Sequence, residues 1–179
     1  NIEFSLAANN ETVFQLASAT KLFTGTLVMK LIEEGSLDLD QSITTYLTDL
    51  PLSWQGIKIK HLLSHTHGIV DYPQTNGWQQ LSEEERDKLS AIEIVRLCAR
   101  EPLEFTAGDQ FSYSIIGYVS IAAIIEKLFN KTFDQVIDEK IFNPLEMKSS
   151  TYGDHRVVIK NRNANQYTYQ RGVLENWPF

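Results

Sequence analysis

The chain has 179 residues, of which 42% are hydrophobic and 22% are charged, as in a folded globular protein rather than a disordered one. Its formal net charge of −7 argues against nucleic acid or an anionic membrane as the main partner. No apolar run approaches the roughly 18 residues that span a bilayer, so the sequence predicts no transmembrane segment in this chain.

The first third of the chain predicts a short strand followed by helices. The alternation in TVFQLA favours a strand over residues 12–17. Apolar residues then recur at helical spacing over residues 18–34, and Gly35 supplies a helix stop. Residues 36–47 predict a turn and a short helix. Residues 57–68, IKIKHLLSHTHG, predict an extended piece that leads into one or two helical turns.

The rest of the chain predicts a loop, more helices and a strand-like tail. Proline, asparagine and glycine over residues 71–80 indicate a surface loop. Residues 112–128 are apolar nearly all round, which is typical of a helix buried in the centre of a domain. Alternating stretches such as YTYQ and VLEN favour strands after residue 151. Two capping boxes mark helix starts: Ser90 with Glu93, and Thr132 with Gln135.

These elements predict an α+β fold in a single domain over residues 1–179. The region over about residues 18–150 is mostly helical, and the parts at about 1–17 and 151–179 are strand-like. No repeat or low-complexity segment divides the chain. The single cysteine, Cys98, has no partner for an internal disulfide.

A serine and a lysine stand three residues apart in the otherwise apolar stretch LASATKLF. If Ser18 opens a helix, Lys21 lies one turn further along the same face. The helix N-terminus supplies partial positive charge and free N–H groups, which favour a developing oxyanion. A partly desolvated lysine there is expected to be neutral often enough to accept the serine proton. The alternative is that Ser18 is a plain N-cap and Lys21 a surface residue.

Four blocks of sequence follow one another over about residues 12–170. They are FQLASATKLFTGTLVMKLIEEGSLDLDQSITTYL, IKIKHLLSHTHGI, AGDQFSYSIIGYVSIAAIIEKLFNKTF and IFNPLEMKSSTY. Together with the S-x-x-K pattern, they resemble one branch of the penicillin-recognising serine enzymes: class C β-lactamases, D-alanyl-D-alanine carboxypeptidases, D-aminopeptidases and related carboxylesterases. The resemblance implies a β-lactamase/transpeptidase-like fold and a serine hydrolase that forms an acyl-enzyme.

The resemblance also implies roles for the matching residues. Ser18 corresponds to the acylated nucleophile, and Lys21 to the lysine that helps to deprotonate it. Tyr113 corresponds to the tyrosine that passes the proton to the leaving group. A tyrosine beside a lysine ammonium has a lowered pKa, which suits this role. The backbone N–H of Ser18 would be half of an oxyanion hole.

The second family motif departs from its pattern at Ile115, where the family has asparagine. Isoleucine cannot hydrogen-bond a substrate amide. We therefore expect Ile115 to bind substrate as part of an apolar wall begun by Ile116, and to favour esters over β-lactams and peptides. The same departure keeps open a non-enzymatic hypothesis, a penicillin-binding-like module without efficient turnover.

The expected partner is a small-molecule ester, β-lactam or D-amino-acid peptide. No cofactor is implied, and the sequence names no partner protein. The resemblance favours a location outside the cytoplasm, either periplasmic, secreted or membrane-anchored.

The resemblance further predicts that the β-lactamase-like domain is incomplete in this chain. The family's first strands would precede residue 1. Its third motif, K-T-G or H-x-G on a strand, would follow residue 179 and supply the second oxyanion donor. We therefore expect the chain alone to turn over substrate poorly or not at all.

A zinc-dependent hydrolase is the weaker alternative. The stretch HLLSHTHGIVD contains four candidate ligands: His61, His65, His67 and Asp71. Its H-x-H resembles the start of a metallo-β-lactamase site, but such sites need Asp and then His where Ile69 and Val70 stand. Only His155 remains to complete a ligand set, so no metal ligand is predicted. The resemblance instead implies a structural turn in which His65 bonds backbone. An α/β-hydrolase is not indicated, because no G-x-S-x-G occurs.

Overall fold

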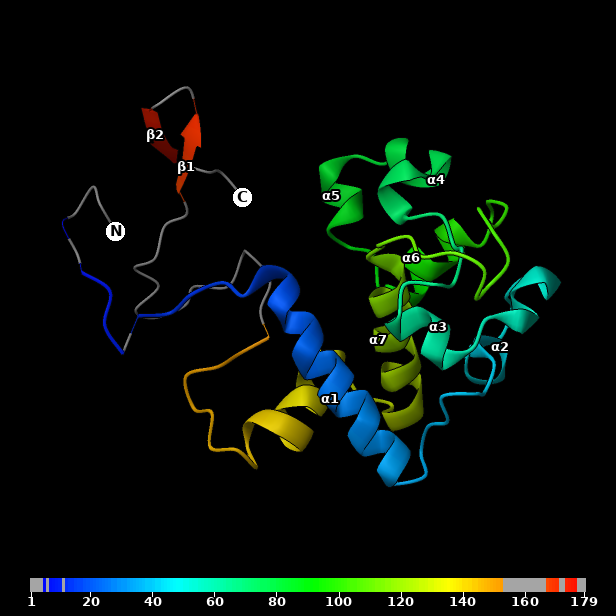
Figure 1. Ribbon diagram of the computed structural model, residues 1–179, viewed down its shortest axis with the longest axis horizontal. Helices are drawn as coiled ribbons and strands as arrows, with labels where there is room; N and C mark the ends of the chain where they lie inside the picture. Colours follow the sequence, from blue (N-terminus) through cyan, green and yellow to red (C-terminus); the bar gives the residue numbers. More distant parts are fainter. Residues whose placement is uncertain (1–4, 6, 11, 153–166, 171–172, 177–179) are drawn as a thin grey trace.

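Helices make up most of the structure, a computed structural model that describes residues 5, 7–10, 12–152, 167–170 and 173–176 (Figure 1). The α-helices are α1 (Thr20–Glu33), α2 (Ile43–Tyr46), α3 (Ile59–Leu63), α4 (Asn76–Gln79), α5 (Glu83–Arg86), α6 (Ala91–Cys98), α7 (Ile116–Phe129) and α8 (Phe133–Ile137). Short 3₁₀ turns are η1 (Ala17–Ala19), η2 (Leu52–Gly56) and η3 (Tyr72–Gln74), and η4 (Asp138–Phe142) is a π-helical turn.

Two strands follow the helices. Strand β1 (Tyr167–Gln170) pairs antiparallel with β2 (Val173–Asn176), with Tyr167 opposite Asn176. This pairing confirms the strands predicted from YTYQ and VLEN. The strand predicted over residues 12–17 is wrong, because residues 12–16 belong to no strand and Ala17 belongs to η1. A strand needs a partner for its backbone groups, and within the described residues only β1 and β2 form a sheet.

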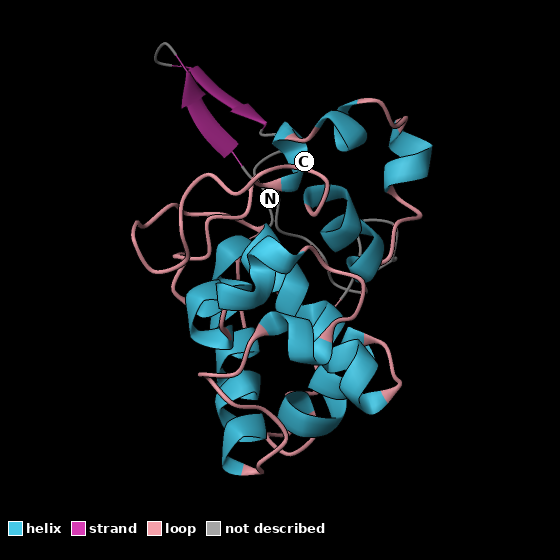
Figure 2. Cartoon of the chain, turned by 90° about the vertical axis from the view of Figure 1, so that its right-hand side faces the viewer, coloured by secondary structure: helices cyan, strands magenta, loops and turns pink. Residues whose placement is uncertain are grey.

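Helix α7 forms the centre of the helical region. It packs against α1, α2, α3, α6 and α8, and Figure 2 shows these helices gathered in one body with the hairpin to one side. Its buried residues are Ile116, Gly117, Ser120, Ile121, Ala123, Ile124 and Ile125. The predicted central helix is therefore confirmed, but it begins at Ile116 and not at residue 112, and residues 112–115 lie outside it.

Helix α1 supplies the neighbouring layer of the core. Leu27, Val28 and Leu31 are fully buried on one face, and each such side chain contributes about 1.5–3 kcal/mol through burial. On the other face, Leu22 is 73% exposed and Met29 is 48% exposed. The half-buried helix keeps its N-terminal end accessible.

The second half of the helical region largely follows the predicted helix signals. The Ser90–Glu93 and Thr132–Gln135 capping boxes are both formed. Helix α8 continues into η4, which ends at Phe142. The loop predicted over residues 71–80 instead contains η3 and α4, because the Thr75 hydroxyl caps α4 by accepting the Trp78 N–H at 3.2 Å.

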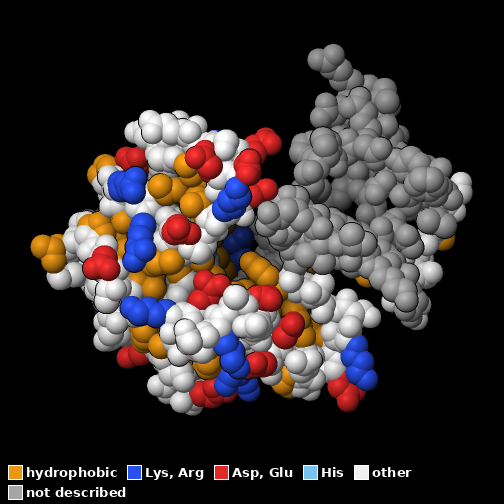
Figure 3. Space-filling model, turned by 180° about the vertical axis from the view of Figure 1, so that it is seen from behind, with side chains coloured by type: hydrophobic (Ala, Val, Ile, Leu, Met, Phe, Trp, Pro, Cys, Tyr) orange, Lys and Arg blue, Asp and Glu red, His pale blue; other side chains and the backbone are white. Residues whose placement is uncertain are grey.

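Charged side chains of both signs are interspersed over the face shown in Figure 3. Exposed ion pairs such as those of Asp40 with Lys58 and Lys60 contribute about 0–1 kcal/mol each. Burial around α7 therefore outweighs the surface charges in holding the fold together. Within the described residues, no helix has both the length and the apolar character needed to cross a bilayer.

Gly68 and Gly25 give a matched test of how tightly the turn at Gly68 is packed. Gly68 has a φ of +72°, and a Cβ there would lie 2.1 Å from the Phe105 carbonyl oxygen. We expect Gly68→Ala to lower the free energy of unfolding by about 3 kcal/mol or more. Gly25 lies inside α1 with nothing within 4 Å of an added Cβ, so Gly25→Ala should raise that free energy by about 1 kcal/mol. Urea denaturation measures both; equal effects would contradict the tight packing at Gly68.

Candidate active site

Ser18 lies in the 3₁₀ turn η1, directly before the N-terminal end of α1. The helix predicted to begin at Ser18 therefore begins two residues later, at Thr20. The preceding Ala17 has a φ of 45°, in the left-handed region, which costs a residue with a Cβ about 1–3 kcal/mol. Such strain is concentrated at functional sites, where the surrounding structure over-determines the backbone.

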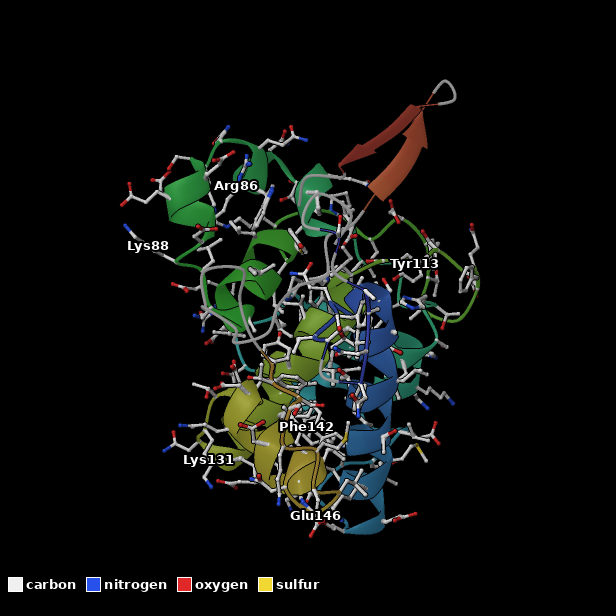
Figure 4. All side chains as sticks on the ribbon, turned by 90° about the vertical axis from the view of Figure 1, so that its left-hand side faces the viewer. Arg86, Lys88, Tyr113, Lys131, Phe142 and Glu146 are labelled. Carbon is white, nitrogen blue, oxygen red and sulfur yellow. The ribbon has the colours of Figure 1, made fainter. Side chains whose placement is uncertain are left out.

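The structure brings three of the predicted site residues together at this end of α1. The Oγ atom of Ser18 lies 2.8 Å from the hydroxyl oxygen of Tyr113. The Nζ atom of Lys21 donates to the same Oγ at 3.5 Å. Figure 4 shows Tyr113 beside the N-terminal end of α1. The contact joins residues 95 positions apart in the sequence, so only folding creates it.

The Lys21 ammonium group is held between two tyrosine rings. Its Nζ atom lies 5.2 Å from the centroid of the Tyr113 ring and 5.4 Å from that of the Tyr118 ring, within the range of cation–π attraction. The Tyr118 hydroxyl donates to the Leu63 carbonyl oxygen at 3.2 Å, which fixes the second ring. The positive charge is therefore fixed close to the Ser18 hydroxyl.

This charge changes the acidity of Tyr113. Hydrogen bonding with the Lys21 ammonium lowers the pKa of the Tyr113 phenol, and the hydrogen bond with Ser18 lowers that pKa further. A nearby cation favours the phenolate over the neutral phenol. A larger fraction of Tyr113 is then ionised near neutral pH, where it can accept a proton from Ser18.

Two residues that the sequence offered as candidate zinc ligands instead hold the segment that carries Tyr113. The Ser114 N–H donates to His65 Nδ1 at 3.3 Å, and the Ser112 N–H donates to the His65 carbonyl oxygen at 2.9 Å. The prediction that His65 bonds backbone is confirmed. The Asp71 carboxylate accepts the N–H groups of the next two residues, Ile115 and Ile116.

The role of Asp71 was not predicted from the sequence. No local sequence signal pointed to it, because the N-cap at Ile115, whose side chain makes no capping hydrogen bond, is identified only in the structure. A buried helix start without a local cap needs an acceptor from elsewhere in the fold.

The other histidines of this stretch also bond backbone. His61 Nδ1 accepts the Lys58 N–H at 3.2 Å, and His67 Nδ1 accepts the Ile69 N–H at 3.0 Å. Across the described part of the chain, no three or more His, Cys, Asp or Glu side chains form a group that could hold a metal ion. His155 lies outside the described residues.

Exposure alternates along residues 111–116, which lead into α7. Phe111, Tyr113 and Ile115 are exposed, with Ile115 at 39%, whereas Ser114 is buried. Ile115 is therefore exposed, as Tyr113 is. The apolar wall expected to begin at Ile116 is wrong, because Ile116 is fully buried in the core as the first residue of α7.

Comparison with known proteins places this geometry in context. The beta-lactamase family model matches residues 4–178. Penicillin-binding protein 4* of Bacillus subtilis is 31% identical over 160 residues, which cover 88% of this chain and 34% of that protein.

Among solved structures, D-amino acid amidase from Ochrobactrum anthropi SV3, complexed with L-phenylalanine amide, is 28% identical with a TM-score of 0.79, covering 98% of this chain and 49% of that one. EstCE1, described as a hydrolase with promiscuous acyltransferase activity, is 25% identical with a TM-score of 0.80, covering 99% and 49%. These likenesses confirm the predicted β-lactamase/transpeptidase-like fold. The chain spans about a third of the length of the curated relatives and about half of the solved chains that it matches.

The influence of Lys21 on Tyr113 can be measured directly. We expect Lys21→Met to raise the pKa of Tyr113 toward the ordinary tyrosine value of about 10, because the stabilising cation is removed. Ultraviolet titration measures the change, with Tyr113→Phe identifying the relevant transition. Lys30→Met removes a lysine from the same helix that pairs with Glu34, and it should leave the transition unchanged. The same Tyr113 pKa in Lys21→Met and wild type would contradict this electrostatic coupling.

Proposed function

The chain belongs to the beta-lactamase family, and on this premise we propose that it carries the nucleophile of a serine hydrolase that acts on esters or amides through an acyl-enzyme. The observation that carries the proposal is the 2.8 Å contact between Ser18 Oγ and the Tyr113 hydroxyl, beside Lys21. The amidase and the hydrolase among the similar solved structures support a substrate with an acyl carbonyl group.

In the proposed acylation step, the Tyr113 phenolate accepts the Ser18 proton while Oγ forms a bond to the substrate carbonyl carbon. The Ser18 backbone N–H stabilises the resulting oxyanion. Collapse of the tetrahedral intermediate breaks the bond to the leaving alcohol or amine, which takes the proton from Tyr113. Lys21 stabilises the phenolate throughout.

In the proposed deacylation step, water attacks the acyl carbon and gives its proton to Tyr113. The acyl–Oγ bond then breaks, Ser18 recovers a proton from Tyr113, and the carboxylic acid product leaves. Both steps use the same short Ser18–Tyr113 contact, because in each step Tyr113 accepts a proton from the attacking group and then gives it to the leaving group.

The proposed substrate class depends on Ile115, which lies two residues after Tyr113 in the sequence. Ile115 is exposed, but its side chain offers no hydrogen-bonding group. A substrate amide or peptide would therefore lose a partner at this position, whereas an ester with an apolar acyl chain would not. We favour short-chain esters for this reason. The same observation supports the alternative function, a penicillin-binding-like module that is acylated without efficient turnover.

Covalent labelling separates these two functions. A fluorophosphonate probe should add its mass to the peptide that contains Ser18, and Ser18→Ala should abolish the labelling, whereas Ser53→Ala, which changes an exposed serine in η2, should not. Labelling together with hydrolysis of p-nitrophenyl butyrate by the full-length protein supports the hydrolase. Labelling of the full-length protein without hydrolysis supports the binding module. A folded protein that is not labelled at Ser18 would overturn both.

The substrate preference can be shifted at a single position. In the full-length protein, we expect Ile115→Asn to raise the ratio of nitrocefin turnover to p-nitrophenyl butyrate turnover by about three- to ten-fold, the effect of one added hydrogen bond. Leu52→Asn changes an apolar residue that is 82% exposed in η2, and it should leave the ratio unchanged. An unchanged ratio in Ile115→Asn would mean that position 115 does not contact the substrate.

A further inference from the structure

The turn formed by residues 65–71 binds the backbone at the start of α7 through hydrogen bonds. Ser112 and Ser114 donate their N–H groups to His65. The Ile115 N–H donates to both carboxylate oxygens of Asp71 at 3.1 Å, and the Ile116 N–H donates to Asp71 Oδ1 at 2.9 Å. Four backbone N–H groups within five residues are therefore bound by one short turn.

Asp71 makes the stronger of these hydrogen bonds. Its carboxylate faces the N-terminus of α7, where the helix dipole gives partial positive charge. Hydrogen bonds from amides to an ionised carboxylate are stronger than bonds between neutral groups. No side chain next to the helix start competes for these amides, because the N-cap residue is Ile115. Asp71 is half-buried, so water replaces it poorly.

Tyr113 lies within the backbone segment that these hydrogen bonds hold. Its two neighbours, Ser112 and Ser114, are both bonded to His65, and its ring packs on the His65 imidazole with centroids 4.5 Å apart. Two residues further along, Asp71 fixes the start of α7. The backbone of Tyr113 is therefore held from both sides, which limits where its hydroxyl can lie relative to the Ser18 Oγ.

We propose that Asp71 is a positioning residue of the site: by holding the first turn of α7, its carboxylate keeps the Tyr113 hydroxyl against Ser18. This inference rests on the proposed function for its effect on turnover, but not for its effect on the geometry. Asp71 does not touch the reacting atoms. A proton-transfer group displaced by about 1 Å can lose about 100-fold in rate.

Two substitutions at Asp71 separate its hydrogen bonds from its charge. Asparagine keeps one side-chain oxygen, which can accept both the Ile115 and the Ile116 N–H, whereas alanine removes both acceptors. In the full-length protein, we expect Asp71→Ala to lower kcat for p-nitrophenyl butyrate by about 10- to 100-fold with little change in KM. Asp71→Asn should retain most of the wild-type kcat.

A matched control shows whether a lost helix cap alone explains the effect. Ser90 caps α6 in a capping box with Glu93, and Ser90→Ala removes that cap from a helix that carries none of the proposed catalytic residues. Ser90→Ala should lose stability while its kcat stays within about two-fold of wild type, because no group near Ser18 moves. An equal loss of kcat in Ser90→Ala and Asp71→Ala would overturn the inference.

Two further readouts do not depend on turnover. Hydrogen exchange of the Ile115 and Ile116 amides should accelerate in Asp71→Ala and stay slow in Asp71→Asn. The negative charge of Asp71 raises the pKa of Tyr113 against the larger effect of Lys21. Both Asp71 variants should therefore lower that pKa, whereas only the alanine variant should lower the kcat plateau.

The outcomes distinguish this inference from the proposed function. If the wild type is neither labelled nor active, the proposed function fails. The contact itself then decides the role of Asp71: nuclear Overhauser effects between the Tyr113 ring and the Ser18 β-protons should persist in Asp71→Asn and disappear in Asp71→Ala. Their persistence in Asp71→Ala, an unchanged kcat in that variant, or equal losses of kcat in both variants would each overturn the inference.

Discussion

Helix α7 packs against other helices and begins at the fully buried Ile116, whose amide needs an acceptor from within the protein. Its N-cap residue, Ile115, offers no side-chain acceptor, and burying an unpaired N–H group would cost as much as a lost hydrogen bond. The acceptors come from the 65–71 turn instead. The packing of the core thus requires the turn that holds Tyr113, and stability and the geometry of the site depend on the same contacts.

Lys21 and Asp71 have opposite effects on the pKa of Tyr113, the tyrosine beside Ser18. Burial, and then the Lys21 charge, lower the pKa of His65, so the imidazole stays neutral and its Nδ1 remains an acceptor for the Ser114 N–H. Lys21 favours the phenolate of Tyr113, and the charge of Asp71 opposes it. The Lys21 ammonium group thus lies beside the Tyr113 phenol, whereas the Asp71 carboxylate binds the Ile115 and Ile116 amides further along the chain.

Local sequence patterns were sufficient for most helices and for both strands. The helical spacing of the α1 segment, the two capping boxes and the apolar run of α7 act over a few residues, and each appears in the structure. The predictions that failed depended on distant partners. Residues 12–16 alternate as a strand does but pair with no strand in the described part of the chain. Residues 112–115 were predicted as the first residues of the central helix, yet the amides of Ser112, Ser114 and Ile115 bond to the 65–71 turn.

The sequence by itself determined the spacing of Ser18 and Lys21, because three residues correspond to one helical turn wherever the helix lies. It identified Tyr113 only through its resemblance to a family, since no local pattern joins residues 95 positions apart. Only the tertiary structure decided that Ala17 adopts a left-handed backbone before the serine, and that Asp71 binds the start of α7. Periodicity and capping act between neighbours along the chain, whereas Asp71 and the amides that it binds are 44 and 45 positions apart and meet only in the folded protein.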